Sequence, residues 1–392
     1  MKRRYDDMPA KFIYGFRKFI ADSGMLRRLY FKTSCRYGIF RAPGIIRKYF
    51  RNKKCLFNDA PARYVKAGRN IFAIPDLPPL NSSLFAQYIL EDLAVVLENK
   101  KPPLLFAIVC ITSRCPYKCP YCYNSDMHTD YELLSFELLQ ATISGLIETG
   151  IHNIYLSGGE PMMRYNDLIR LLGSFAEKKI GFWLLSTGYG LNFEKLYELK
   201  QSGLRGVMIS LDHYQPEIIN KVKGSPNAFN YAVSAIENAN KAGLVVAIDS
   251  VSGKDLLTDD GFRTFVKFAG DHGAHFINCY TPRRFQTDLD PGFTNFTMDE
   301  FIQLSRLTRE NQMLKKHLPV TNSPDAWEST RGCMGGKLFI YIDPQGNVKP
   351  CPFVKLSAGN IKEKGIGEIL KEMHQSLPDF RCRTMEMIEG KL

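Results

Sequence analysis

Three cysteines within eight residues are the part of this sequence best suited to chemistry. Cys115 and Cys119 are separated by three residues, and Cys122 follows after two more. Three thiolates on one short loop can each hold one iron of a [4Fe–4S] cube, and the fourth iron then lacks a protein ligand. Zinc is the alternative, but zinc sites usually show paired cysteines with a fourth Cys or His at a suitable distance. The spacing therefore favours an iron–sulfur cluster.

A second motif gives this cluster a family context. Gly158-Gly159-Glu160-Pro161, which alone would ordinarily be a tight turn, follows the next apolar run after the cysteines. Together the two motifs resemble those of the radical S-adenosylmethionine (SAM) enzymes, over roughly residues 104–280. The resemblance implies that the open iron chelates the amino and carboxylate groups of SAM. It also implies that Tyr121 stacks near the adenine and that Glu160 binds the methionine amino group.

Two shorter motifs follow later apolar runs. Ser186-Thr187-Gly188 stands where the family often has Thr-Asn-Gly, and Ser210-Leu211-Asp212 resembles its Ser-Leu-Asp. The resemblance implies that Ser186, Ser210 and Asp212 help to bind the cofactor or face the substrate. The alternative for Ser210 and Asp212 is that they cap the helix that follows. Lys223 occupies a position where relatives commonly carry arginine, so the planar fork that would bind a carboxylate is absent there.

A second cysteine group lies near the C-terminus. Cys333 and Cys351 bracket an expected hairpin with Gly346 inside it, and Cys382 comes later. The C-x12-G-x4-C order resembles the auxiliary-cluster extension called SPASM in its long form and twitch in its short form. The resemblance implies at most one auxiliary [4Fe–4S] cluster, held by Cys333, Cys351 and Cys382, with the fourth ligand unassigned. Buried cysteines without a metal, or a zinc site, are the alternatives.

These motifs lie on loops between alternating strands and helices. Short apolar runs predict strands at Leu104–Ile111, Asn153–Leu156, Gly181–Leu185, Gly206–Ile209, Val245–Ile248 and His275–Asn278. Helical periodicity lies between them, near 135–149, 165–178, 192–202, 226–242 and 260–272, with a further helix near 298–313. This order predicts an α/β fold, a partial (β/α)6 TIM-like barrel, with its chemistry at the carboxyl ends of the strands.

Composition divides the chain into four predicted parts. Residues 1–60 contain sixteen Lys and Arg and four acidic residues, which equals the +12 charge of the whole chain. We expect a basic helical arm over 1–60, a lead-in packed on the barrel over 61–102, a radical SAM core over 103–324, and a small α+β auxiliary-cluster module over 325–392.

The basic arm also contains twelve aromatic residues. Between Phe12 and Ile20 the apolar residues recur at helical spacing, which predicts an amphipathic helix that lies on an anionic membrane. Helices packed on the barrel with a solvated basic face, and a nucleic-acid arm, are the alternatives, the latter less favoured. There is no long apolar run and no apolar region typical of a secretory signal, so we expect a cytoplasmic protein, peripheral at the cytoplasmic membrane face.

The function implied by the resemblance is reductive cleavage of SAM to a 5′-deoxyadenosyl radical that abstracts hydrogen from a substrate. The reductant would be an electron donor such as flavodoxin or ferredoxin, and the auxiliary cluster would aid oxidation or bond formation. A lipid or lipid-linked substrate is our hypothesis because of the arm. A ribosomally made peptide, modified by a maturase, and another small molecule are the alternatives. A non-catalytic iron–sulfur electron-transfer protein is the alternative from another class.

Overall fold

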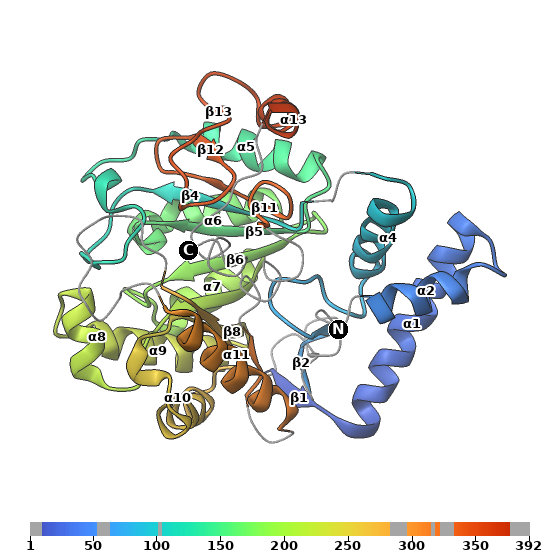
Figure 1. Cartoon of the computed structure of the whole chain (residues 1–392). Coiled ribbons are helices and arrows are strands. Elements are labelled where there is room, and N and C mark those ends of the chain that lie inside the picture. The colour runs from blue at the N-terminus through green and yellow to red at the C-terminus, as the bar shows by residue number, and fades with distance from the viewer. Residues whose placement is uncertain are drawn as a thin grey trace.

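A parallel sheet forms the body of the protein. The computed structural model describes residues 10–52, 63–100, 104–282, 296–314, 318–321 and 333–376 (Figure 1). Six strands follow one another in the chain, and each pairs in parallel with the next. They are β4 (Phe106–Thr112), β5 (Asn153–Gly158), β6 (Gly181–Ser186), β7 (Leu204–Ser210), β8 (Val245–Val251) and β9 (Phe276–Tyr280). The predicted six-stranded α/β core is confirmed, with strand ends shifted by one to three residues.

Helices follow the strands and cover the outer face of the sheet. They are α5 (Phe136–Glu148), α6 (Tyr165–Ser174), α7 (Phe193–Gln201), α8 (Pro216–Lys223), α9 (Ala228–Lys241), α10 (Asp259–Asp271) and α11 (Met298–Met313). No residue range was predicted for α8, because eight residues are too few to show a clear period. Its ends are nevertheless typical: Pro216 stands in its first turn and Gly224 closes it in the left-handed conformation.

The C-terminal module extends the same sheet. Its strands are β11 (Phe339–Ile342), β12 (Asn347–Lys349) and β13 (Gly359–Asn360), followed by α13 (Ile366–Ser376). β11 pairs in parallel with β4, and β10 (Val320–Thr321) pairs with β9 at the opposite edge. The described sheet therefore has ten strands in the order β10-β9-β8-β7-β6-β5-β4-β11-β12-β13, and the barrel is incomplete. The shared sheet fixes the module directly beside the first barrel strand.

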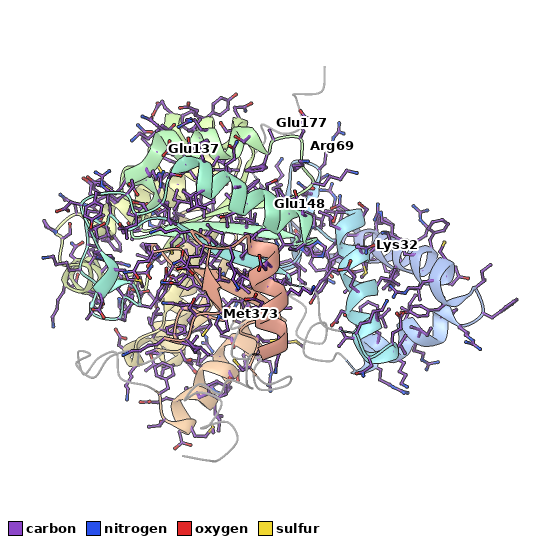
Figure 2. The ribbon with its side chains drawn as sticks, turned by 90° about the horizontal axis from the view of Figure 1, so that it is seen from above. Lys32, Arg69, Glu137, Glu148, Glu177 and Met373 are labelled. Carbon is purple, nitrogen blue, oxygen red and sulfur yellow. The ribbon has the colours of Figure 1, made fainter. Side chains whose placement is uncertain are left out.

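The N-terminal arm lies to one side of the barrel. It contains β1 (Lys11–Ile13), α1 (Gly15–Tyr37) and α2 (Ala42–Asn52), which pack beside α4 (Ser83–Leu97). Figure 2 shows Lys32 of α1 far from Met373 of α13. The prediction of a helix from Phe12 is wrong at its start, because Phe12 pairs with Val65 in a sheet and the helix begins at Gly15. Among the described residues, no helix is both long enough and apolar enough to cross a bilayer.

A small antiparallel sheet fills the amino end of the barrel. It consists of β1, β2 (Tyr64–Ala67) and β3 (Asn70–Phe72). Phe72 packs edge-on against the buried Trp183 of β6, with ring centroids 6.0 Å apart. Beside them the Tyr155 hydroxyl donates to the carboxylate of Asp76 over 2.6 Å. Because this end is packed with side chains, the carboxyl end is where ligands can approach the inner face.

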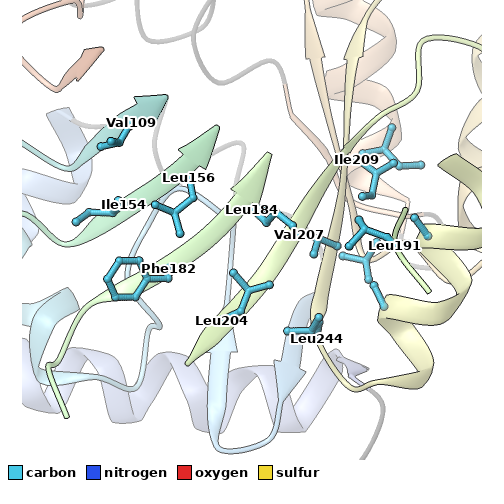
Figure 3. Close-up of a cluster of buried hydrophobic side chains, with 14 of the residues drawn as sticks. Val109, Ile154, Leu156, Phe182, Leu184, Leu191, Leu204, Val207, Ile209 and Leu244 are labelled. Carbon is cyan, nitrogen blue, oxygen red and sulfur yellow. The ribbon is translucent and has the colours of Figure 1, made fainter. Parts of the chain in front are cut away.

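Alternate residues of each strand point to opposite faces of the sheet, one toward the helices and one toward the barrel interior. On β5, Ile154 and Leu156 face the helices, while Tyr155 between them faces the barrel interior. Figure 3 shows the outer cluster, in which Leu184 of β6 and Val207 of β7 continue the same apolar layer. Packing on both faces makes the strands rigid supports for the loops at their carboxyl ends.

Candidate active site

The three clustered cysteines lie on the loop that follows β4. The loop folds tightly: the amide of Cys122 donates to the carbonyl of Cys119 over 3.2 Å. Burial raises the pKa of the Cys115 thiol to about 12 and that of Cys122 to about 11. Thiols in such surroundings stay protonated at neutral pH unless a metal replaces the proton.

The Gly-Gly-Glu-Pro motif packs directly against this loop. The amide of Gly159 donates to the carbonyl of Thr112 over 2.9 Å, and the amide of Glu160 donates to the carbonyl of Arg114 over 2.8 Å. A Cβ atom added to Gly159 would lie 2.3 Å from the Arg114 carbonyl oxygen and 2.8 Å from the Cβ of Cys115. Glycine is therefore required at position 159, because any side chain would push the motif away from the cysteines.

Glu160 is fully buried and held by four donors. Oε1 accepts from the Ser186 hydroxyl (2.8 Å) and the Met162 amide (3.2 Å), while Oε2 accepts from the amide (2.8 Å) and hydroxyl (2.5 Å) of Thr187. Burial raises the pKa of this carboxyl, and the four hydrogen bonds oppose that rise. Ser186, predicted as a cofactor contact, thus lies against Glu160. Pro161 begins a short 3-10 helix, Pro161–Arg164, that starts the turn away from the site.

A second polar group joins the cysteine loop to the end of β7. The Tyr121 hydroxyl donates to Asp212, and the buried ammonium of Lys223 lies 3.2 Å from that hydroxyl and 2.7 Å from the Ser210 hydroxyl. Ser210 and Asp212 do not cap α8, whose N-cap is Gln215. The capping alternative is therefore wrong, and the structure brings both residues to the cysteine loop.

Asp249 and Asn278 also point into the barrel at this end, and sequence reasoning missed both. They lie in register with Ser210 across β7, β8 and β9. The Asn278 amide donates to Asp249 over 2.7 Å, and burial raises the pKa of Asp249 to about 7. The predicted strand Val245–Ile248 ended three residues before β8 does, and a single carboxylate after an apolar run has no distinctive spacing.

His213 does not join this group. Its Nε2 lies 3.1 Å from the carboxylate of Asp255, and its Nδ1 accepts from the amide of Gln215 over 3.0 Å. Both ring nitrogens are used by neighbouring loop residues, so the ring orders the chain before α8.

A hydrogen-bonded chain connects the C-terminal module to the two motifs. Tyr341 of β11 donates to Asn124 over 2.5 Å, and the Asn124 amide donates to the carbonyl of Gly158 over 3.2 Å. The Cys110 thiol donates to the Tyr341 hydroxyl over 3.3 Å. Asn124 and Tyr341 are both buried, so the module helps to hold the cysteine loop in place.

Two of the predicted auxiliary cysteines, Cys333 and Cys351, lie on chain segments that run together at one end of the β11–β12 hairpin. The amide of Gly336 donates to the carbonyl of Pro350 over 3.1 Å, and a Cβ added to Gly335 would lie 3.3 Å from that of Cys351. The chain containing Cys333 therefore runs beside Cys351. Gly346, with φ +93°, turns the hairpin between them. Cys382 lies outside the described residues.

The three thiols of the cysteine loop are the donor set of an iron–sulfur cube that keeps one iron open. In the part of the chain that the structure describes, no three His, Cys, Asp or Glu side chains converge on one metal position. A cube instead takes one thiolate for each iron, so its ligands need not converge. The close approach of Gly159 to Cys115 brings the Gly-Gly-Glu-Pro motif against the loop that would hold the cluster.

Comparisons with known families agree with this geometry. The model of the radical SAM superfamily matches residues 109–269, and that of the SPASM iron–sulfur cluster-binding domain matches residues 333–389. Together the two matches span more than half of the chain. Both cysteine groups lie within them, and so do Glu160, Lys223 and Asp249.

Individual relatives extend the likeness. AdoMet-dependent heme synthase of Oleidesulfovibrio alaskensis is 26% identical over 75% of this chain and 81% of its own length. GTP 3′,8-cyclase of Nautilia profundicola is 27% identical over 64% of this chain and 77% of its own. The crystal structure of Streptococcus suis SuiB bound to precursor peptide SuiA shares the fold at a TM-score of 0.60, with 15% identity over 90% of this chain and 84% of that chain. The chain belongs to the radical SAM superfamily, as an enzyme that uses a [4Fe–4S] cluster and SAM and carries an auxiliary iron–sulfur domain of the SPASM type.

Proposed function

We propose that Cys115, Cys119 and Cys122 hold the SAM-binding [4Fe–4S] cluster and that Glu160 holds the SAM amino group. The packing of Gly159 against the cysteine loop carries this proposal, since it brings the buried carboxylate of Glu160 beside the thiols. When bound, the cluster and SAM supply the radical chemistry that removes a hydrogen atom from substrate. The protein contributes orientation and exclusion of water.

Glu160 needs one free oxygen position to accept an ammonium group. Three of its four donors are fixed in place. Two are backbone amides, and the third is the Ser186 hydroxyl, which also accepts from the amide of Gly188 over 3.0 Å. Among the described residues, the Thr187 hydroxyl has no hydrogen bond other than the one to Glu160. We infer that this hydroxyl turns away when the SAM amino group arrives, while Ser186 and two amides keep the carboxylate in position.

Lys223 provides the positive charge of the site. Its burial opposes ionisation, but the neighbouring Cys119 and Asp212 raise its pKa overall, so the ammonium form is kept. A fixed cation near the loop offsets the negative charge of thiolates and favours their deprotonation when iron binds. Through its bond to Lys223 and its donation to Asp212, Tyr121 keeps the orientation in which we propose that it lies near the adenine.

The substrate is proposed to reach the inner face of the barrel near Asp249 and Asn278. The Oδ1 atom of Asn278 is buried and has no hydrogen-bond partner among the described residues, so it is available to a substrate donor. Cys333, Cys351 and Cys382 are proposed to hold the auxiliary cluster, which would accept an electron from a substrate radical or bind the substrate. An electron donor such as flavodoxin or ferredoxin would reduce the SAM-binding cluster.

We favour a lipid or lipid-linked substrate. The support is the arm, whose outward side chains combine exposed aromatic rings with basic residues: Phe16 is 75% exposed and Phe31 68% exposed. Binding at the cytoplasmic membrane face would bring the enzyme to the bilayer that holds such a substrate. The second candidate is a peptide, because SuiB, with the same fold over 90% of this chain, was crystallised with its precursor peptide SuiA.

Anaerobic reconstitution followed by reduction with SAM tests the proposal. We expect about eight irons per chain and release of 5′-deoxyadenosine that increases when the substrate is present. A detergent extract of membrane lipids and a library of short peptides, supplied separately, discriminate the substrate classes by which one increases 5′-deoxyadenosine. About four irons per chain would overturn the auxiliary cluster. Loaded protein that forms no 5′-deoxyadenosine with either supply would overturn the catalytic assignment.

A further inference from the structure

Helix α1 has apolar residues on two opposite faces. Met25 and Leu29 on one face are buried against α4 and the barrel lead-in. On the other face, Phe16 and Phe31 are exposed to 75% and 68%. A surface helix normally turns polar residues outward, because exposed aromatic rings gain nothing from solvent.

The exposed residues form a single stripe. At 100° per residue, the side chains directed away from Met25 include Phe16, Phe19, Ile20, Tyr30 and Phe31. The turn after α1 adds Ile39 and Phe40, which are 63% and 100% exposed. We call these seven side chains the α1 outer face. The rings of Phe16 and Phe19 already stack on one another, with centroids 6.4 Å apart.

Basic residues surround the α1 outer face. Residues 10–52 contain eleven Lys and Arg and one acid, Asp22, which already pairs with Lys18 over 3.0 Å. An open groove of about 430 Å³ lies between α1 and α4 at the edge of the stripe. It is lined by Arg27, Arg28, Phe31, Lys32, Ser83 and Ala86. Aromatic and cationic groups are therefore presented together on the same side of the arm.

We propose that the α1 outer face docks on the anionic leaflet of a lipid bilayer, with its rings at the acyl boundary and its basic groove on phosphate headgroups. This inference rests on the proposed lipid substrate and specifies where the enzyme meets it. Aromatic rings beside Arg and Lys suit the membrane interface, where the rings leave water and the cations meet phosphate. Arginine side chains also reach toward headgroups while their methylene stems stay in apolar surroundings.

Other occupants fit the surface less well. A second copy of the chain would bring the basic residues of two arms together, and like charges oppose such contact. Nucleic acid would match the charge, but aliphatic Ile20 and Ile39 offer no stacking surface for bases, whereas acyl chains accept them. The combination of aliphatic, aromatic and cationic side chains favours lipid.

Vesicle sedimentation of the full-length chain tests the docking. Vesicles of phosphatidylcholine with about 30% phosphatidylglycerol should bind the protein at about 0.1 M salt, and binding should fall at least about tenfold near 0.5 M. The double variant Phe16→Ser, Phe31→Ser should weaken binding at least about tenfold. Its matched control is Ile302→Ser, Met313→Ser, which removes two exposed apolar side chains from α11 and should change nothing.

Reversing two neighbouring charges gives a second test. Arg27→Glu with Arg28→Glu should weaken vesicle binding about thirtyfold or more. Lys178→Glu with Lys179→Glu, two adjacent exposed residues outside the arm, should leave it unchanged. The proposal would be overturned if the two double variants lost vesicle binding equally, or if the wild-type chain bound fully to neutral phosphatidylcholine vesicles. Binding to RNA without binding to vesicles would overturn it in favour of nucleic acid.

The same variants separate this inference from the proposed function. Cleavage of SAM by the reconstituted protein in solution should be equal in wild type, the serine double variant and the charge-reversed variant. If SAM is cleaved but no variant alters vesicle binding, the docking surface is wrong and the radical chemistry remains. If vesicles bind as expected but SAM is never cleaved, the enzyme assignment fails and the docking surface remains.

Discussion

The carboxyl end of the barrel and the N-terminal arm use polar and apolar groups in opposite ways. At the barrel end the charged side chains are buried and hold one another: Glu160 accepts four hydrogen bonds, and Lys223 bonds to Tyr121 and Ser210. On the arm the rings of Phe16 and Phe40 are exposed beside basic residues. The barrel end is organised before any ligand arrives, whereas the arm presents groups whose partners lie outside the chain.

This difference implies that catalysis and docking can be changed separately. The charged side chains of the barrel end have partners within it, so a substitution there should disturb cofactor binding and stability. The arm attaches through its buried face to α4, so deleting it would uncover the apolar side chains that share a core cluster with Met25 and Leu29, among them Phe85 and Tyr88 of α4. Single substitutions on its exposed face are therefore better probes than deletion.

Loss of one cluster ligand should give the largest effect. Cys119→Ser should reduce iron after reconstitution from about eight to about four per chain and abolish 5′-deoxyadenosine formation, since serine does not replace a thiolate on iron. Vesicle binding should be unchanged, which would separate the two regions directly. Iron analysis with visible absorbance measures the loading.

Cys35 provides the matched control, because it is an exposed cysteine on α1 outside both cysteine groups. Cys35→Ser should keep full iron and full SAM cleavage. Equal iron in Cys119→Ser and wild type would contradict the assignment of the cluster loop.

Most of the barrel could be predicted from the sequence, because each strand is a compact apolar run between helical segments. Strand β8 shows where this stops: the run ends at Ile248, and the inward Asp249 looks like the start of a loop. Strands β1 and β10 have three and two residues, too few for alternation to be visible. Phe12 had the spacing of a helix, but pairing with Val65 in tertiary structure decided its conformation.

The parts of the site that lie within one loop could be predicted from their motifs. The parts formed by residues from separate strands could not. Spacing identified Cys115 to Cys122 and Gly158 to Pro161. The bond between Tyr341 and Asn124 joins residues 217 positions apart, and the bond from Asn124 to Gly158 joins residues 34 apart, so no local pattern reports them. Lys223 was noted only as a departure from arginine, although its buried contacts with Tyr121 and Ser210 place its ammonium group in the site.

Asp249 should make stability depend on pH. Its folded pKa is raised from 3.8 to about 7 by burial, so above pH 4 the unfolded chain loses the proton first and stability falls until about pH 7. Asp249→Asn keeps the oxygen that accepts from Asn278 and removes the titration. The variant should be more stable than wild type by about 2–4 kcal/mol at pH 8, and by little near pH 4.

Urea unfolding at pH 4, 6 and 8 measures this difference. Burial also raises the pKa of Asp76 to about 6, so the stability of the variant should still fall somewhat as the pH rises. Asp271→Asn, an exposed carboxylate paired with Lys267, is the control and should change stability by less than about 0.5 kcal/mol. Equal stability of Asp249→Asn and wild type at pH 8 would show that Asp249 is solvated.

A smaller effect is expected where the arm is attached to the body. The hydroxyl of Tyr49 on α2 donates to the buried carboxylate of Asp92 on α4 over 2.6 Å. Tyr49→Phe removes that donor and should cost about 1–3 kcal/mol in urea unfolding. Tyr37→Phe removes a bond of the same length to Glu98 at an exposed site, and should cost less than about 0.5 kcal/mol. Equal losses would mean that burial does not distinguish the two contacts.

The smallest expected change is on the α1 outer face itself. Phe16 is 75% exposed, so Phe16→Ser removes little buried surface and should alter the free energy of unfolding by less than about 0.5 kcal/mol. Met25, on the opposite face of the same helix, is 6% exposed, and Met25→Ser should cost about 2–5 kcal/mol because it opens a cavity against α4. If Phe16→Ser instead destabilises the chain as much as Met25→Ser, that ring is packed within the protein in solution and is not available to a membrane. An unchanged unfolding free energy with weaker vesicle binding would mean that the ring serves contacts outside the chain.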